Sequence, residues 1–220
     1  MVELWEAIAD NFPELASGYW LTVRTVTISF VIALVIGTAV ALLRIAPTRV
    51  LRAIGTVYVE VFRGLPLLVL LIMAFSGLRR AGVPITATVA GPATLGLYTA
   101  AYVAEILRSG FFAVGKGQRE ASLSLGLDGG QTMRHVVLPQ AFRTVIPPLA
   151  SLTVAMIKNS AIIGGSLLAT QDLLKEARIE VGASGNATPL FFWAAVGYLT
   201  LTVGATVIAR RLETRYAVRR

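Results

Sequence analysis

Apolar stretches of about twenty residues are the feature of this sequence that most restricts its fold. An α-helix rises about 1.5 Å per residue, so roughly 20 apolar residues cross the ~30 Å hydrocarbon core of a bilayer. The composition agrees, because 55% of the 220 residues are hydrophobic and only 15% are charged. Such a chain does not suit a water-facing surface. We therefore expect an all-α, polytopic membrane protein and exclude a disordered, fibrous or disulfide-rich secreted one.

The stretches predict five transmembrane helices in a single domain that covers residues 1–220. The segment before the first stretch carries acidic residues and no Lys or Arg, so we interpret that stretch as a retained span and not as a signal peptide. The longest hydrophilic connection is the loop 108–148, between the third and fourth spans. The predicted spans are 21–43, 56–78, 89–107, 149–169 and 190–209.

Basic residues are unevenly distributed between the two sides that these spans define. Thirteen Lys and Arg residues fall on the side of the loop 108–148, four fall on the opposite side, and three lie inside spans. Because positively charged loops stay in the cytoplasm, we predict a multi-pass protein of the inner (plasma) membrane with its N-terminus outside and its C-terminus cytoplasmic. The net charge of +8 is explained by this topology, so we expect no nucleic-acid partner.

The sequence offers no catalytic or metal-binding set. It has no Cys and a single His, which excludes a Cys/His metal cluster, and we expect no cofactor. Gly110, Gly115 and Lys116 match the first seven positions of a phosphate-binding P-loop, but Gly117 stands where a Ser or Thr must hold magnesium. We therefore predict that the chain binds no nucleotide and is not itself an enzyme.

The loop 108–148 has clear helix boundaries. Good helix formers between Lys116 and Leu127 end at Gly126, a residue that readily takes the left-handed conformation after a helix. Asp128, with Gln131 three residues later, is typical of the start of a second helix, which we expect to reach Val137. Prolines at positions 139, 147 and 148 are expected to stop or bend this helix and to separate it from the fourth span.

The same loop carries a spaced signature. Glu120-Ala121-Ser122 is followed after three residues by Gly126, and after nine more by Val136-Val137-Leu138-Pro139. This pattern resembles the signature of the membrane subunits of ABC importers. The sequences FRGLPL at 62–67, AEILRSG at 104–110, KGQ at 116–118 and LPQAFR at 138–143 resemble the polar-amino-acid branch of that family.

The resemblance implies a type I importer permease with a cytoplasmic coupling helix held in a groove of a separate ATPase. It also implies a second permease subunit, identical or different, an external substrate-binding protein, and a polar amino acid as substrate. ATP would be hydrolysed by the separate subunit. The residues to which the resemblance assigns coupling are Glu120, Ala121, Ser122, Gly126, Leu127, Leu138 and Pro139.

Charged and polar residues within the spans are candidates for the translocation pathway. Lys158 is predicted near the bilayer middle, where a charge costs at least ~2.5 kcal/mol and is expected to face a polar cavity or a partner. Lys158 either lines the route, with Asn159 and Ser160 extending the polar patch, or pairs with Glu60. Two further candidates remain open between structural ion pairs and substrate contacts: Arg63, beside Glu60, and Glu105, beside Arg108.

The substrate is less well defined than the class. Lys158-Asn159-Ser160 and the segment 97–102 (LYTAAY) look most similar to acidic-amino-acid members of the family. An ion-coupled secondary carrier or channel is the alternative function. It would need coupling-ion residues and usually paired repeats, and the sequence shows neither.

Overall fold

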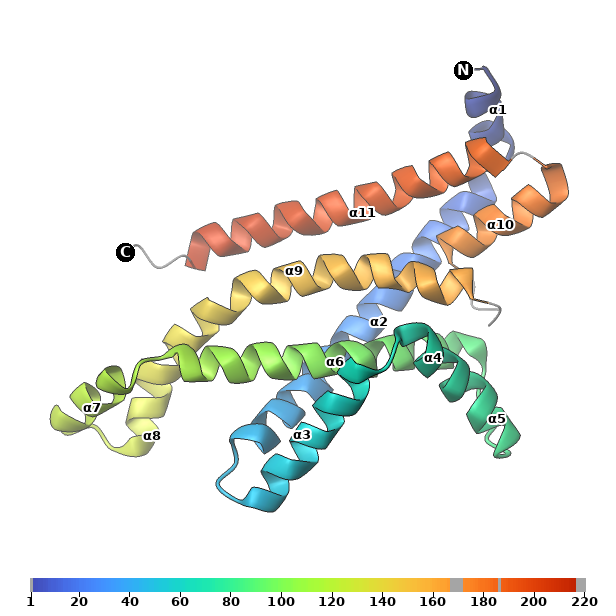
Figure 1. Ribbon diagram of the computed structural model, residues 1–220. Helices are drawn as coiled ribbons and strands as arrows, with labels where there is room; N and C mark the ends of the chain where they lie inside the picture. The colour runs from blue at the N-terminus through green and yellow to red at the C-terminus, as the bar shows by residue number, and fades with distance from the viewer. Residues whose placement is uncertain (1, 167–171, 186, 217–220) are drawn as a thin grey trace.

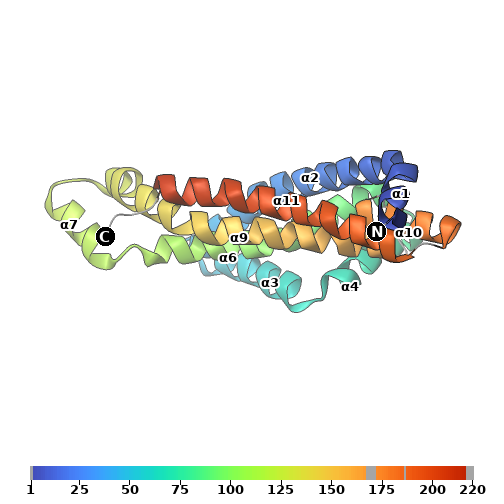
Figure 2. The same ribbon diagram turned by 90° about the horizontal axis from the view of Figure 1, so that it is seen from above.

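The computed structural model describes residues 2–166, 172–185 and 187–216, and within them it is helical without strands. Long helices form an elongated bundle (Figures 1 and 2), which confirms the all-α prediction. The elements are α1 (Val2–Asp10), α2 (Phe12–Ile45), α3 (Arg49–Gly64), α4 (Leu67–Ile72), the π-helical turn η1 (Met73–Gly77), α5 (Leu78–Arg80), α6 (Ala87–Ala113), α7 (Lys116–Ser124), α8 (Gly129–Thr132), the π-helical turn η2 (Met133–Val137), α9 (Leu138–Gly165), α10 (Leu173–Ser184) and α11 (Ala187–Tyr216).

Close packing of α2 against α6 forms the centre of the bundle. A Cβ at Gly37 would lie 2.6 Å from the Cβ of Val103, and a Cβ at Gly96 would lie 2.7 Å from that of Ile32. In lipid, helix association depends on close van der Waals packing, which small residues allow. The two glycines therefore set the distance between α2 and α6.

The second predicted span is not a continuous helix. Its predicted range, 56–78, is interrupted where α3 ends at Gly64 and α4 starts at Leu67, with the axes bent by 104°. Pro66 lacks a backbone N–H and disfavours the helical region for the residue before it, and Leu65 is extended at φ −101° and ψ 139°. The predicted span 56–78 is therefore sharply bent at Pro66, and its crossing of the membrane stays a prediction.

The predicted separation between the loop helix and the fourth span is also wrong. One helix runs from Gly129 to Gly165 through η2 and through the prolines at 147 and 148. Pro139 lies in the first turn of α9, and the missing N–H groups are tolerated in a membrane helix where local π-helical adjustment redistributes the backbone bonds. The predicted end of the span, 167–169, lies outside the described residues.

Three helices of the described chain are long and apolar enough to cross a membrane: Phe12–Ile45, Gly129–Gly165 and Ala187–Arg215. The bent pair α3 to α5 supplies a fourth candidate. α6 has 27 residues, enough for about 40 Å, but it buries Thr94, Gly96 and Thr99 among its neighbours and so needs little apolar surface. The count of five crossings stays a prediction.

The two ends of the bundle carry different structures. α7 and α8 project from one end, while α1 and α10 lie together at the other, where α11 begins (Figure 1). We call these the loop end and the α10 end. The chain thus starts at the α10 end, and α11 leads back to the loop end.

Candidate functional site

The loop end carries the helix for which the sequence predicts a coupling role. α7 ends after Ser124, and Gly126 follows at φ +83°. The Gly126 N–H donates to the Leu123 carbonyl at 3.0 Å, and the Leu127 N–H donates to the Ser122 carbonyl at 3.2 Å. These bonds satisfy carbonyls at the helix end. The predicted glycine termination is confirmed.

A capping box starts the next helix. The carboxylate of Asp128 accepts from the Gln131 N–H at 2.8 Å, and the Gln131 side chain accepts from the Asp128 N–H at 2.9 Å. Such reciprocal bonds satisfy two donors that a helix start leaves unpaired. The turn between α7 and α8 is therefore short and held at both ends, as the sequence predicts.

One buried residue fixes α7 to the following helix. Ser122 is 3% exposed, and its hydroxyl lies 3.0 Å from that of buried Thr132. Glu120 and Ala121 are exposed beside it, and Leu125 is 83% exposed. The exposed acidic and apolar side chains of this loop are therefore held in place at the loop end by the contact between Ser122 and Thr132.

Leu138 and Pro139 lie elsewhere. They form the start of α9 and line an apolar groove between α2, α6 and α9. The amide of Gln140 donates to the side-chain oxygen of Gln118 at 3.3 Å, so this segment contacts α7 only at its edge. The geometry thus divides the sequence signature into a surface half on α7 and a groove-lining half on α9.

Glu105 is the centre of an ion-pair cluster. It pairs with Arg44 of α2, with Arg108 one turn later at 2.6 Å, and with Arg63 of α3 at 3.9 Å. The Arg63 guanidinium also lies 5.3 Å from the ring centre of Tyr102. A quarter of the Glu105 side chain is exposed, so one partly buried carboxylate ties three helices together.

Glu60 does not join these pairs. Every salt bridge in the described part of the chain contains Glu105, and Glu60 is exposed on α3. α3 packs on its neighbours through buried Val59, and at 100° per residue Arg63 lies much nearer that face than Glu60 does. Of the alternatives that the sequence left open, the ion pairs of Glu60 with Arg63 and with Lys158 are absent among the described side chains.

The three polar residues of α9 do not share one face. Lys158 is exposed, Asn159 is partly buried, and Ser160 is 1% exposed with its hydroxyl donating to the Ile157 carbonyl at 2.7 Å. Ser160 faces the bundle, where buried Met156 and Ile163 contact α4 and α6. Only Lys158 presents its charge outside the packed core.

A polar cluster at the α10 end was not predicted. Asp172 is 1% exposed, caps α10 by accepting from the Lys175 N–H at 2.9 Å, and accepts from the Tyr198 hydroxyl at 2.8 Å. A Cβ at Gly164 would overlap its carboxylate, and Thr22 accepts from the Leu173 N–H at 3.0 Å. Burial raises the pKa of Asp172. An Asp directly before a helix-forming run was the available signal.

Together these features define a helical, polytopic membrane protein with a structured helix–turn–helix at one end. The sequence profile of the binding-protein-dependent transport system inner membrane components matches residues 20–218. The chain therefore belongs to this family of transport permease subunits.

Relatives and solved structures agree with this assignment. The probable glutamine ABC transporter permease protein GlnM of Bacillus subtilis is 36% identical over 94% of this chain and 97% of its own length. The glutamate transport system permease protein GluC of Corynebacterium glutamicum is 34% identical over all of both chains. A chain in the crystal structure of an amino acid ABC transporter with histidines superposes with a TM-score of 0.89 at 32% identity, covering 95% of this chain and 97% of that one.

Proposed function

We propose that this chain is the permease subunit of an ATP-driven importer for polar amino acids. In this proposal it forms half of a translocation pathway with a second permease subunit, receives substrate from an external binding protein, and is moved by separate ATPase subunits. Relatives named for glutamine and glutamate support the substrate class. The similarity of Lys158-Asn159-Ser160 to acidic-amino-acid members favours an acidic substrate.

The observation that carries the proposal is the rigid construction of the loop end. The positive φ of Gly126 and the capping box at Asp128 hold α7 against the long helix that continues as α9. α7 is exposed, ends before the next helix starts, and is anchored to that helix by the buried hydroxyls of Ser122 and Thr132. A helix held in this way can transmit a movement of a bound partner to the membrane helices. We assign it to docking on the ATPase.

Two substitutions test the coupling assignment. Glu120→Lys reverses an exposed charge, and Gly126→Val places a β-branched residue at φ +83°, a conformation that costs non-glycine residues about 1–2 kcal/mol. Both should leave membrane insertion intact and lower transport and substrate-stimulated ATP hydrolysis together. The matched controls are Glu6→Lys, exposed near the other end of the bundle, and Gly82→Val, at a glycine outside the loop 108–148 with the same φ of +83° and no neighbour within 4 Å. If both test variants stimulated ATP hydrolysis as strongly as the parent protein does, the assignment would be refuted.

Orientation is tested with single cysteines, because the sequence contains none. Ser124 on α7 and Ala183 on α10 are exposed at opposite ends of the bundle. In spheroplasts, a membrane-impermeant maleimide should label Ala183→Cys and leave Ser124→Cys unlabelled until the membrane is opened. The reverse pattern would refute a cytoplasmic loop end.

Lys158 is our candidate for a pathway residue that attracts substrate carboxylates. Its exposed ammonium pairs with no carboxylate among the described side chains. Lys158→Met should therefore assemble normally but transport poorly, with the largest loss for acidic amino acids. Adding Glu60→Gln to this variant should not restore transport. Lys175→Met, at the α10 end, is the control. Full transport by Lys158→Met would exclude this role.

A further inference from the structure

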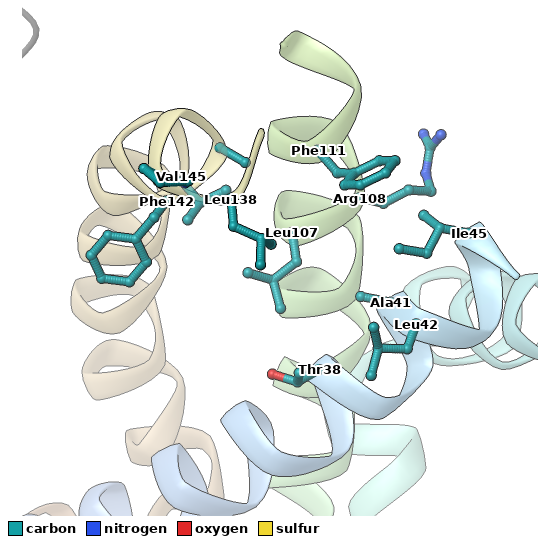
Figure 3. A pocket seen from close by; sticks show the side chains of 12 residues that line it. Thr38, Ala41, Leu42, Ile45, Leu107, Arg108, Phe111, Leu138, Phe142 and Val145 are labelled. Carbon is teal, nitrogen blue, oxygen red and sulfur yellow. The ribbon is translucent and has the colours of Figure 1, made fainter. Parts of the chain in front are cut away.

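An apolar groove of about 500 Å³ opens at the loop end of the bundle. One wall is α2 from Thr38 to Ile45, the other is α9 from Leu138 to Val145, and α6 forms the floor with Leu107 and Phe111 (Figure 3). Ile45 follows Thr38 by seven positions, so the groove is about 10 Å long along α2. This length fits within the hydrocarbon layer of one leaflet, which is about 15 Å thick.

The groove is poorly suited to an amino acid. Its lining side chains are apolar apart from Thr38 and Arg108. Leu42, Leu138 and Phe142 each expose more than half of their surface. A polar ligand would lose its hydration there and gain few partners, whereas a hydrocarbon chain requires none.

One end of the groove is strongly basic. The guanidinium of Arg108 lies at the end where Ile45 and Phe111 are found, away from Thr38 (Figure 3). The guanidinium of Arg119 lies 4.5 Å from the ring centre of Phe111. Arg44 is also nearby, since it shares the Glu105 carboxylate with Arg108.

The positive charge at this end is only partly neutralised. Arg44, Arg63 and Arg108 share a single carboxylate, that of Glu105, whereas Arg119 donates to the Phe111 carbonyl at 3.3 Å and pairs with no carboxylate in the described part of the chain. The Nε atoms of Arg108 and Arg119 are buried and have no hydrogen-bond partner in the described part of the protein. These Nε atoms are closed to an external ligand, but the Arg108 side chain is 32% exposed, and guanidinium groups bind phosphate oxygens by charge-assisted bonds. The basic end is therefore complementary to a phosphate group.

We propose that the groove binds one acyl chain of an anionic phospholipid of the cytoplasmic leaflet, with the phosphate beside Arg108 and Arg119. The inference rests on the proposed orientation, which places the loop end at the anionic leaflet. An acyl chain gains little by moving from other acyl chains into the groove, so it only fills the space between α2 and α9. The selection comes from the net negative charge of the headgroup, which a zwitterionic lipid with the same phosphate lacks. A charge-assisted contact of about 1.4 kcal/mol corresponds to about a tenfold preference for the anionic lipid.

Photolabelling of the permease–ATPase complex in nanodiscs tests the site. The probes are phosphatidylglycerol and phosphatidylcholine with the same diazirine-bearing acyl chain, and labelled peptides are mapped by mass spectrometry. We expect phosphatidylglycerol to label the walls of the groove about tenfold more than phosphatidylcholine. Thr38→Trp should fill the groove and remove most of this labelling. Ala39→Trp adds the same side chain to an exposed neighbour that does not line the groove and should leave labelling unchanged.

Three outcomes would overturn the proposal. Equal labelling by the two lipids would exclude selection by the basic end, and undiminished labelling of Thr38→Trp would exclude the groove. An equal loss in Ala39→Trp would show that the effect is not specific to the site. ATPase co-purification and stimulation are measured on the same preparations, so their failure with intact, selective labelling would count against the proposed function and not against the lipid site.

Discussion

Removing the carboxylate of Glu105 should destabilise the protein more than any other single loss of charge in the described bundle. Glu105→Gln keeps the size of the side chain but leaves the Arg44 guanidinium, only 11% exposed, without its anion. Arg108 and Arg63 are 32% and 43% exposed and are better solvated. The main cost therefore comes from the pair between α2 and α6.

The magnitude follows from this burial. Breaking a buried ion pair from one side costs about 3–5 kcal/mol, and partial exposure of the cluster favours the lower limit, about 3 kcal/mol. For a chain of this length, 1 kcal/mol corresponds to about 2–4 °C in Tm, so the expected decrease is about 6–12 °C. Glu60→Gln, on the exposed side of α3, should change the free energy of unfolding by less than about 0.5 kcal/mol.

Thermal unfolding in detergent, followed by size-exclusion fluorescence, measures both variants. The double variant Arg44→Met with Glu105→Gln should recover much of the lost Tm, because replacing both partners removes the uncompensated charge. The reasoning is refuted if Glu105→Gln melts within about 2 °C of the parent. It is also refuted if the double variant melts below the single one.

Three further predictions concern the α10 end, the helix packing and the loop end. Burial raises the folded-state pKa of Asp172 above its unfolded value. This group therefore favours folding most at low pH, and its contribution to stability is lost as pH rises through the folded pKa. Asp172→Asn keeps a capping acceptor and should lessen the decline of Tm with pH. Gly37→Leu should separate α2 from α6 and cost at least about 1–3 kcal/mol, measured by Tm, with Ala39→Leu on the exposed side of α2 as a neutral control. Ser122→Val should leave the Thr132 hydroxyl without its partner at a local cost of about 1–3 kcal/mol, seen as faster proteolysis within 108–148 and unchanged cleavage elsewhere.

Local chemistry made the loop end predictable. Gly126 and Asp128 act through bonds within a few residues of themselves, so their roles follow from residue type and spacing. The size of the break at Pro66 could not be predicted, because hydropathy depends on the composition of a stretch and not on its continuity. Pro147 shows the opposite error, since α9 continues through a residue that usually ends helices.

Partners of the charged residues depended on tertiary packing and were harder to predict. Glu60 and Arg63 are close in sequence, yet Arg63 pairs with Glu105, forty-two positions later. Asp172 meets Tyr198 and Gly164 only because α9, α10 and α11 converge. Sequence spacing describes one helix, whereas these contacts depend on how helices are rotated against each other.

The continuous helix from Gly129 to Gly165 has a mechanical consequence. Its 37 residues measure about 55 Å along the axis, with the capped turn at one end and the Asp172 contact at Gly164 near the other. A tilt of about 5° around either end displaces the opposite end by about 5 Å over that length. The π-helical turn and Pro139 lie in the third of this helix nearest the capped turn, and Pro147 and Pro148 lie at its middle. Bending is therefore concentrated between the capped turn and the middle, and the segment from Leu149 to Gly165 moves as a stiff rod. A small tilt of the helix at the loop end can therefore displace the backbone near Lys158 by about the length of a side chain, without local unfolding.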